Sequence, residues 1–451
     1  MLLRFSSPHT HFFPNTFSQN TLSHARRPRS TRFENLAHGP SGTEAKEAIW
    51  TFRLDTKSGG LVRLSVVEQP VCNPAFSRMH PFRSVMYACT ESVVENGEIV
   101  ALGVDTHSGE LEILNSTDAL GTSTCYITID KEARNMLIVN YWDASIHVFR
   151  LDPRGRIVEH RSKYDPNEGR SMVAKAGLGF QGRVNHSEND ASAQAERQAD
   201  PHSHAIILDN IYGRIAYVPD LGADTVHQFL FDPDAGTLAP LGSFPSGTPG
   251  KTALGPRYIE FHPSLPVAYV INELSSEVAV FVFDVEEAEK MLAWSRQAGA
   301  VSKSANGKSP PQFKTLRLVQ NISTIPDAWP RSKNTCGRIT VHRSGDFVLC
   351  SNRGHDSIAS FFIQHHSEPP GLLSLSTIQH THGETPRHFA FDPSGEWLIS
   401  ANQDSDSVTV FRFNGARGEF TKQGDGYSVP SPNFVCPIDS RKYTKLSQAS
   451  L

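Results

Sequence analysis

The sequence predicts an all-β fold, a seven-bladed β-propeller of four-stranded blades. Three observations lead to this prediction. A strand–turn–strand–turn–strand pattern recurs along the chain at intervals near fifty residues. The 29 prolines and 32 glycines favour many turns over long helices. A closed ring of such units leaves no sheet edge exposed, which is a physical reason to repeat the unit within one chain.

The clearest copy of the repeat begins at Pro386 and ends at Phe413. Its first two strands are joined by Asp392-Pro393-Ser394-Gly395, which has the residue types of a type I turn. Residues alternate through its third strand with the period of two that a strand requires. Residues 415–422 can then add a short fourth strand. One copy of the repeat is therefore predicted to form one blade.

Seven copies are recognised by an apolar residue near the end of the third strand. These residues are Phe52, Val104, Phe149, Phe229, Phe281, Phe361 and Phe411. Their successive spacings are 52, 45, 80, 52, 80 and 50 residues. The two long intervals coincide with polar inserts at about residues 162–200 and 286–311, and Glu286–Gln297 in the second insert is predicted to be a short helix.

The propeller is expected to span residues 46–440, with a different kind of segment on each side. Residues 1–45 are expected to be a disordered or targeting segment, because the first 33 residues hold five arginines, many serines and threonines, and no acidic residue. A faulty gene start is the alternative. Residues 441–451 form a C-terminal tail.

The first copy lacks an apolar innermost strand, because residues 32–46 are polar and glycine-containing where such a strand is needed. The stretch from Tyr427 to Cys436 is apolar enough to return beside the first blade and supply that strand. A faulty start of the gene is again the alternative, and the sequence does not choose between the two.

Composition excludes several functional classes. The formal net charge of −4 does not mark a nucleic-acid partner, and no run of eighteen apolar residues indicates a membrane span. The six cysteines include no C-x-x-C pair, which argues against a zinc site and a dense disulfide framework. The chain is expected to be soluble and cytoplasmic, with a mitochondrial location as the alternative suggested by the Arg- and Ser-rich start. Oligomeric state is not indicated.

One charged pair distinguishes a single repeat from the others. Arg257, in Gly255-Pro256-Arg257, and Glu273 lie sixteen residues apart at opposite ends of one strand–turn–strand unit. Charges that depart from the repeat are candidates for function, because the repeats supply only the frame. Structural alternatives exist: Arg257 can pair with any neighbouring carboxylate, and Pro386-Arg387 repeats its dipeptide. Glu273 can simply cap backbone donors, since it aligns with Asp143, Asp220, Gly354 or Gln403 of other repeats.

Several motifs resemble one family across residues 48–439, strongly in the later blades and weakly in the first two. They are Pro201-His202-Ser203-His204, Gly255-Pro256-Arg257, Asn272-Glu273-Leu274, Ser351-Asn352-Arg353-Gly354 and Asn402-Gln403-Asp404-Ser405-Asp406. The chain resembles the seven-bladed propeller lactonases, which include propeller-type 6-phosphogluconolactonases and fungal carboxy-cis,cis-muconate cyclases.

The resemblance implies a site at one mouth of the central channel. Its catalytic residues would be His204, Glu273, Arg257 and Arg353, and the two arginines would also bind substrate together with His202. His204 is preferred to His202 as the catalytic histidine because it precedes an apolar strand at the family's spacing. Each residue also has an ordinary structural reading, as a satisfied imidazole or as a turn residue.

These residue types suit the opening of a lactone. Neutral histidine can take a proton from water near pH 7, and glutamate can serve instead or orient the water. Two guanidinium groups bind an anionic substrate, and the set requires no metal or cofactor. The sequence therefore predicts a lactonase, a carboxylic ester hydrolase, and the resemblance implies 6-phosphogluconolactone as its substrate. The alternatives are a lactone-forming cyclase of the muconate type and a non-catalytic propeller that binds a partner on its rim.

Overall fold

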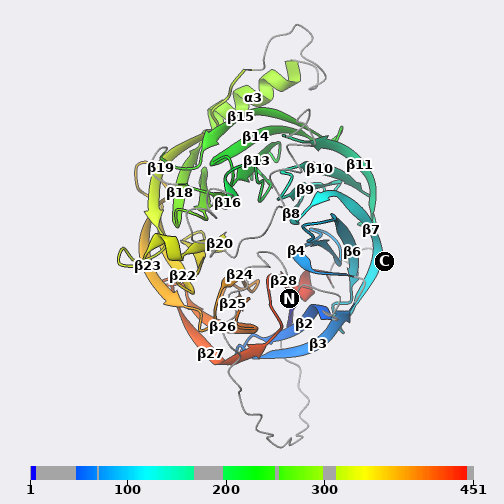
Figure 1. The fold of residues 1–451 in the computed structure, drawn as a ribbon, viewed down its shortest axis with the longest axis vertical. Helices are drawn as coiled ribbons and strands as arrows, with labels where there is room; N and C mark the ends of the chain where they lie inside the picture. Colours follow the sequence, from blue (N-terminus) through cyan, green and yellow to red (C-terminus); the bar gives the residue numbers. More distant parts are fainter. Residues whose placement is uncertain are drawn as a thin grey trace, which may run out of the picture.

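The strands form seven four-stranded sheets in the computed structural model, which describes residues 2–6, 47–68, 71–166, 197–248, 253–297 and 311–443. Figure 1 shows the sheets as blades arranged in chain order around a central axis. In blades 2 to 7 the four strands follow the chain from the innermost to the outermost, and neighbouring strands are antiparallel. The predicted all-β, seven-bladed propeller is confirmed.

The strands of blades 2 to 4 lie between residues 74 and 245. Blade 2 comprises β4 (Pro74–Met79), β5 (Val85–Thr90), β6 (Asn96–Val104) and β7 (Leu111–Thr122). Blade 3 comprises β8 (Thr124–Ile129), β9 (Asn135–Asn140), β10 (Ile146–Leu151) and β11 (Ile157–Tyr164). Blade 4 comprises β12 (Ile207–Leu208), β13 (Ile215–Asp220), β14 (Thr225–Asp232) and β15 (Thr237–Pro245).

Blades 5 to 7 complete the series. Blade 5 comprises β16 (Pro256–Phe261), β17 (Val267–Asn272), β18 (Glu277–Phe283) and β19 (Leu316–Ser323). Blade 6 comprises β20 (Thr335–Val341), β21 (Phe347–Arg353), β22 (Ser357–Gln364) and β23 (Leu372–His380). Blade 7 comprises β24 (Pro386–Phe391), β25 (Trp397–Asn402), β26 (Ser407–Asn414) and β27 (Glu419–Ser428). A 3-10 turn, η1 (Arg331–Lys333), precedes blade 6.

Blade 1 closes the ring with strands from both ends of the chain. Its order is β28 (Cys436–Ile438), β1 (Leu2–Ser6), β2 (Glu47–Asp55) and β3 (Leu61–Glu68). The tail therefore returns beside the first blade, as the sequence predicts, although its strand begins only at Cys436 and residues 427–428 belong to β27.

The start of the chain differs from the expectation for residues 1–45. Residues 2–6 form a strand that pairs in parallel with both β28 and β2, with Leu2 opposite Cys436 and Thr51. These five residues, Leu-Leu-Arg-Phe-Ser, take the second place in blade 1, while β28 takes the innermost place for which residues 32–46 are too polar. The rest of the expected disordered or targeting segment lies outside the described residues.

The core is built between the blades. The second strand of several blades is buried along its whole length, because each sheet packs a neighbour on both faces. The seven apolar residues that define the repeat all lie in third strands and are buried, from Phe361 at 0% exposure to Val104 at 8%. The sequence pattern therefore identified the equivalent strand in every blade.

The second insert contains the predicted helix. It forms α3 (Val285–Gln297), whose Ala288, Met291 and Leu292 pack on the outer side of blades 4 and 5. Figure 1 shows α3 outside the ring.

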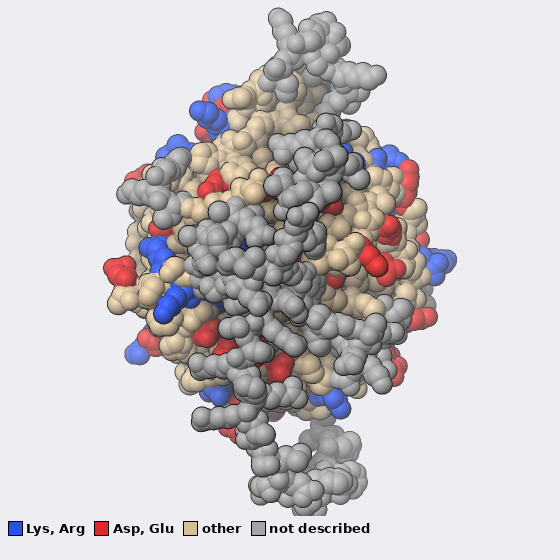
Figure 2. Space-filling view, in the orientation of Figure 1, with Lys and Arg blue, Asp and Glu red and all other residues tan. Residues whose placement is uncertain are grey.

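Residues 167–196 of the first insert and 298–310 of the second lie outside the described residues. No helix in the described ranges is long and apolar enough to cross a membrane. Figure 2 shows that basic and acidic side chains both occur around the rim of one face.

Candidate active site

The pairing of the first two strands brings the charged motifs to one mouth of the channel. Because these strands are antiparallel, the first residue of one lies opposite the last residue of the other: Pro256 pairs with Asn272, and Pro386 pairs with Asn402. Pro74 pairs with Thr90 in the same way. The residue after each of these positions therefore lies at the same end of its blade.

Two arginines occupy β-bulges at this mouth. The ladder of blade 5 passes from Pro256 directly to Tyr258, and that of blade 7 passes from Pro386 to His388, so Arg257 and Arg387 are the extra residues. A bulge re-aims the side chain of its extra residue. The repeated Pro-Arg dipeptide therefore places two guanidinium groups at equivalent positions in two blades. In the sequence alone, the same repetition weakens any catalytic claim for Arg257.

A second set of equivalent positions follows the second strand of each blade. The pairing register assigns Glu273 to the same position as Glu91, Tyr141, Leu221, Arg353 and Gln403. The sequence alignment with Asp143, Asp220 and Gly354 was therefore wrong by one or two residues, and only Gln403 was placed correctly. Turn residues of similar type surround these positions, which is why the alignment slipped.

Buried asparagines fix this second set of positions. Asn140, Asn272 and Asn352 precede Tyr141, Glu273 and Arg353, and each is fully buried. Their Nδ2 atoms donate to backbone carbonyls of the preceding blade, at Ala119 (3.1 Å), Ser246 (2.9 Å) and Thr324 (2.8 Å), respectively. Each asparagine thereby ties its blade to the one before it and holds the next residue at the channel mouth.

Glu273 is held by three arginines. Its side chain is 1% exposed, and Arg257 Nη1 donates to Oε2 at 2.5 Å while Arg353 Nη2 lies 2.8 Å from Oε1. Arg197 Nη2 also donates to Oε1. Burial alone would raise the pKa of this carboxyl, but Arg197, Arg353 and Arg257 outweigh it and hold the pKa well below its usual range. Glu273 is therefore a permanent carboxylate that organises three guanidinium groups.

Arg197 was missed by sequence reasoning. It lies in the last few residues of the first insert, only 8% exposed, and the pattern of the blades does not include it. The only signal in the sequence is a basic residue shortly before His202, at the point where the chain re-enters a blade. An ion pair between residues 197 and 273 can be recognised only when the ring is closed.

His204 is enclosed by aromatic rings. It is 6% exposed, with the ring of Tyr141 5.1 Å away and that of Tyr258 5.4 Å away, both edge-on. Its Nδ1 atom has no hydrogen-bond partner among the described residues. Burial, with the charge of Arg257, keeps the pKa of His204 well below its usual value. The imidazole is therefore neutral at pH 7 and has a free ring nitrogen.

His202 has a different environment from His204. Its ring stacks on Tyr141 at 4.8 Å and meets Trp142 edge-on at 5.1 Å, while its Nδ1 lies 3.2 Å from the carbonyl oxygen of Tyr141. The backbone N–H of His202 donates to Asp220 Oδ1 at 2.8 Å. These contacts fix the segment that carries His204, and His202 is not among the residues that line the cavity described next.

Polar side chains from several blades meet at a small cavity of about 10 Å³ in the channel. They include His204, Arg257, Arg387 and Glu91, which come from four different blades. Tyr258 also lines the cavity, and the Arg257 guanidinium lies 5.1 Å from its ring centroid. Glu273 and Arg353 do not line the cavity: Glu273 contacts Arg257, and Arg353 contacts Glu273. The structure thus brings together three predicted residues in one ion-pair cluster and places His204 beside that cluster.

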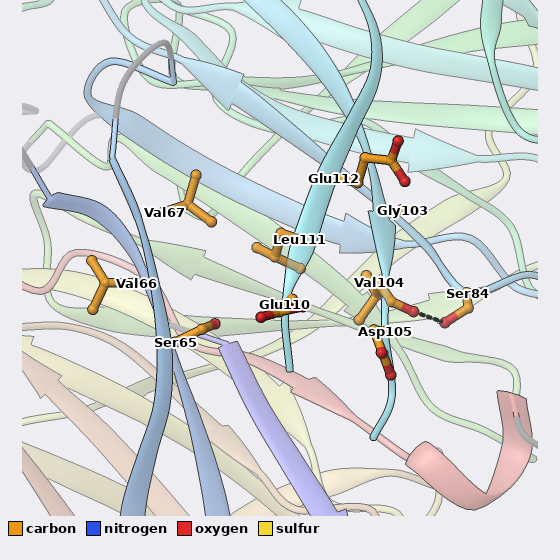
Figure 3. A pocket seen from close by; sticks show the side chains of 10 residues that line it. All are labelled: Ser65, Val66, Val67, Ser84, Gly103, Val104, Asp105, Glu110, Leu111 and Glu112. Atoms are coloured by element: carbon orange, nitrogen blue, oxygen red, sulfur yellow. Dashed lines mark hydrogen bonds between the residues drawn. The ribbon is translucent and has the colours of Figure 1, made fainter. Parts of the chain in front are cut away.

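A second hollow lies far from this chemistry, on the outer side between blades 1 and 2. It has a volume of about 660 Å³, and Figure 3 shows Val67 of β3 and Leu111 of β7 on its walls. The charged side chains that line it are all acidic: Asp105, Glu110 and Glu112. Within the described residues, no group of three or more His, Cys, Asp or Glu could hold a metal ion, here or elsewhere. The channel cavity is therefore the better candidate site.

Comparison with known proteins agrees with this geometry. The chain matches the family described as "Lactonase, 7-bladed beta-propeller" over residues 38–311 and 300–437. The chain belongs to this family of propeller lactonases. Lactonases are carboxylic ester hydrolases, so the enzyme class predicted from the sequence is confirmed.

Individual relatives extend the family assignment along nearly the whole chain. A 6-phosphogluconolactonase of Bacillus subtilis is 29% identical over 88% of this lactonase-family chain and 97% of its own length. Another, from Formosa agariphila, is 29% identical over 83% of this chain and 90% of its own length. The solved structure of a periplasmic gluconolactonase from Pseudomonas aeruginosa has a TM-score of 0.66 at 22% identity, covering 88% of this chain and 96% of its own. That structural likeness concerns the fold.

Proposed function

We propose that this propeller lactonase hydrolyses 6-phosphogluconolactone to 6-phosphogluconate. The observation that carries the proposal is the excess of buried positive charge around a neutral histidine in one cavity. Arg257 and Arg387 line the cavity, and Arg353 and Arg197 surround the single carboxylate of Glu273 next to it. Such a site favours an anionic substrate, since guanidinium groups bind phosphate and carboxylate strongly. Two relatives named 6-phosphogluconolactonase support the choice of lactone.

The residues have distinct roles in this proposal. Neutral His204 accepts a proton from water through its free ring nitrogen as the water oxygen bonds to the lactone carbonyl carbon. Arg257 stabilises the negative charge that develops on the carbonyl oxygen, and its position is fixed by Glu273. Arg353 holds Glu273 from the other side and, with Arg257, favours binding of the substrate anion. His202 supports the loop of His204 by its stack on Tyr141.

A cytoplasmic location is part of the proposal. All six cysteines are free thiols, and five of them are buried. Free thiols are typical of reducing compartments.

Hydrolysis of freshly prepared 6-phosphogluconolactone by the purified protein tests the function. We expect acid release well above the spontaneous rate, and Arg257→Ala should lower kcat/KM by about 100-fold or more, as for loss of a single oxyanion-stabilising donor. Arg417→Ala is the matched control, because Arg417 lies on the rim with its side chain 72% exposed. The unphosphorylated gluconolactone should be a poorer substrate, since it lacks the anion.

Two outcomes would contradict the proposal. Hydrolysis no faster than the spontaneous background, unchanged by Arg257→Ala, would leave a partner-binding propeller as the better explanation. Cyclisation of 3-carboxymuconate without hydrolysis of the sugar lactone would instead favour the lactone-forming alternative. Both substrates can be followed with the same enzyme preparation.

A further inference from the structure

Glu91 is a buried carboxyl group in the cavity that the roles above do not use. It follows β5 and is 7% exposed, and it lines the cavity together with His204, Arg257 and Arg387. Its Oε2 atom accepts no hydrogen bond from any residue that the structure describes. A carboxyl oxygen left unsatisfied inside a protein costs free energy, so its presence at a catalytic cavity calls for a function.

Two hydrogen bonds fix the backbone of Glu91. The N–H group of Glu91 donates to the carbonyl oxygen of Asn73 at 3.0 Å, and Asn73 Nδ2 donates back to the carbonyl oxygen of Glu91 at 2.7 Å. The residue is therefore fixed from both sides at the mouth of blade 2. A backbone fixed in this way limits the positions that the side chain can reach, which reduces the conformational entropy lost when it acts on a substrate.

We propose that Glu91 is the general acid of the lactonase reaction, the group that delivers a proton to the ring oxygen of the lactone. This inference rests on the proposed function. Water adds to the carbonyl carbon and loses its proton to His204. The tetrahedral intermediate then collapses, the bond between the carbonyl carbon and the ring oxygen breaks, and the ring oxygen takes the electron pair together with the proton of Glu91. Solvent afterwards accepts the proton of His204 and reprotonates Glu91.

The electrostatic environment supports this division of labour. Burial raises the pKa of Glu91 to about 7, against the opposing effect of Arg387 and Arg257. The Cys125 thiol and His388, which also line the cavity, are uncharged near neutral pH, because burial raises the pKa of the thiol and lowers the pKa of His388 well below its usual value. One cavity therefore holds a base with a lowered pKa, His204, and an acid with a raised pKa, Glu91. Divergence of this kind assigns acid and base roles in enzymes.

Arg257 links the two sides of the proposed reaction. It lowers the pKa of both His204 and Glu91, and it contacts Glu273 at 2.5 Å. The bound anion of the substrate would offset this positive charge and keep Glu91 protonated. Substrate binding would therefore favour the form of Glu91 that donates a proton.

The pH dependence of kcat in Glu91 variants tests the proposal. Wild-type kcat should fall as pH rises through about 7, because the acid loses its proton. This alkaline limb of the pH profile should persist with gluconolactone, which has no titrating phosphate. Glu91→Gln should lower kcat by about 100-fold or more and abolish the limb. Glu91→Asp should keep the limb with reduced kcat. Glu95→Gln, in the exposed turn that follows, should change neither the rate nor the limb.

The possible outcomes separate this inference from the proposed function. A wild-type chain that does not hydrolyse lactones overturns both. A wild-type chain that hydrolyses them, with the same alkaline limb in Glu91→Gln, overturns only the role of Glu91, since a structural role would lower kcat equally at all pH values. Carbon-13 NMR of the glutamate carboxyl groups, assigned by the signal missing from Glu91→Asp, gives a readout that does not need the Gln variant. A midpoint near 4.5 instead of 7 would also overturn the proposal.

Discussion

Glu91 in blade 2 and Glu273 in blade 5 occupy the same position of the repeat, yet their electrostatic states are opposite. Each follows the residue that pairs with the first residue of its blade. Glu273 contacts three arginines, and its pKa lies well below the usual value. The pKa of Glu91 is raised to about 7, since burial dominates. Equivalent residues in a repeat therefore need not share a chemical state.

The neighbours of each position explain the difference. In blade 5 the bulge residue is Arg257, and the equivalent position of the next blade holds Arg353. In blade 2 the bulge residue is Ala75, and the equivalent position of the next blade holds Tyr141. These two differences, together with Arg197 from the first insert, explain why Glu273 is neutralised by guanidinium groups while the pKa of Glu91 is raised to about 7. The comparison suggests four tests.

The largest effect is expected for Glu273→Gln. Removing the carboxylate leaves three buried guanidinium groups without their shared partner, so the free energy of unfolding should fall by about 3 to 5 kcal/mol at pH 7. Because the folded-state pKa is lowered, the stabilisation by Glu273 is complete above about pH 4.5 and is lost as the pH falls below that value. Chemical denaturation of both proteins at several pH values measures it.

Glu277→Gln is the control for that experiment. Glu277 pairs with Arg331 at 3.4 Å on the surface, with the glutamate side chain 27% exposed, so its loss should cost less than about 1 kcal/mol. Equal destabilisation by the two substitutions would contradict the role of Glu273 as the centre of the cluster.

In the second test, replacing the buried Glu91 is expected to raise the free energy of unfolding instead of lowering it. Because the folded-state pKa is raised from 4.5 to about 7, ionisation of Glu91 opposes folding as the pH rises from 4.5 to 7, and the full cost is present above pH 7. Glu91→Gln should therefore be more stable than the wild type at pH 8, by up to about 3 kcal/mol, and equal to it near pH 4.5. Urea denaturation at both pH values checks this; lower stability of the variant at pH 8 would break the comparison.

A smaller effect is expected at the equivalent position of blade 3. The Tyr141 hydroxyl is hydrogen-bonded to Arg197, the arginine that also contacts Glu273. Tyr141→Phe removes this hydrogen bond and keeps the ring that packs against His202 and His204, so the free energy of unfolding should fall by about 1 to 2 kcal/mol. Thermal unfolding measures the loss. Tyr427→Phe, which loses a hydrogen bond to the backbone of Leu61 at the rim, provides a comparison without effect on Glu273.

The finest test concerns the pKa of Glu91 itself. Arg387 lowers the pKa of Glu91 through its charge, so Arg387→Gln should move the Glu91 titration midpoint above 7. The same NMR titration detects the change. Arg412→Gln, at a rim ion pair with Glu396, should leave the midpoint where it is. A midpoint that moves down in Arg387→Gln would show that the two groups do not face each other.

Much of this molecule could be predicted from its sequence, because local pattern determines local structure. The period of two, the turn residues and the recurring third-strand residue predicted the seven blades and located each of them. The pair of Arg257 and Glu273 was recognised because only this repeat combines the two charges. Glu91 was not recognised, because it lies in one of the early blades, where the family resemblance is weak, and no neighbouring arginine in the sequence marks it.

The tertiary structure alone decided what lies next to what. Closure of the ring brings Arg197 and Arg353 to Glu273, and Arg387 to the cavity of His204, across separations of many tens of residues. The bulges that aim Arg257 and Arg387 depend on pairing register, and the sequence misplaced that register by one or two residues at several turns. The charge state of a buried carboxyl depends on burial and on neighbours within a few ångströms. Sequence therefore determined the frame and the residue types, while the folded ring determined which glutamate is a fixed anion and which retains its proton near pH 7.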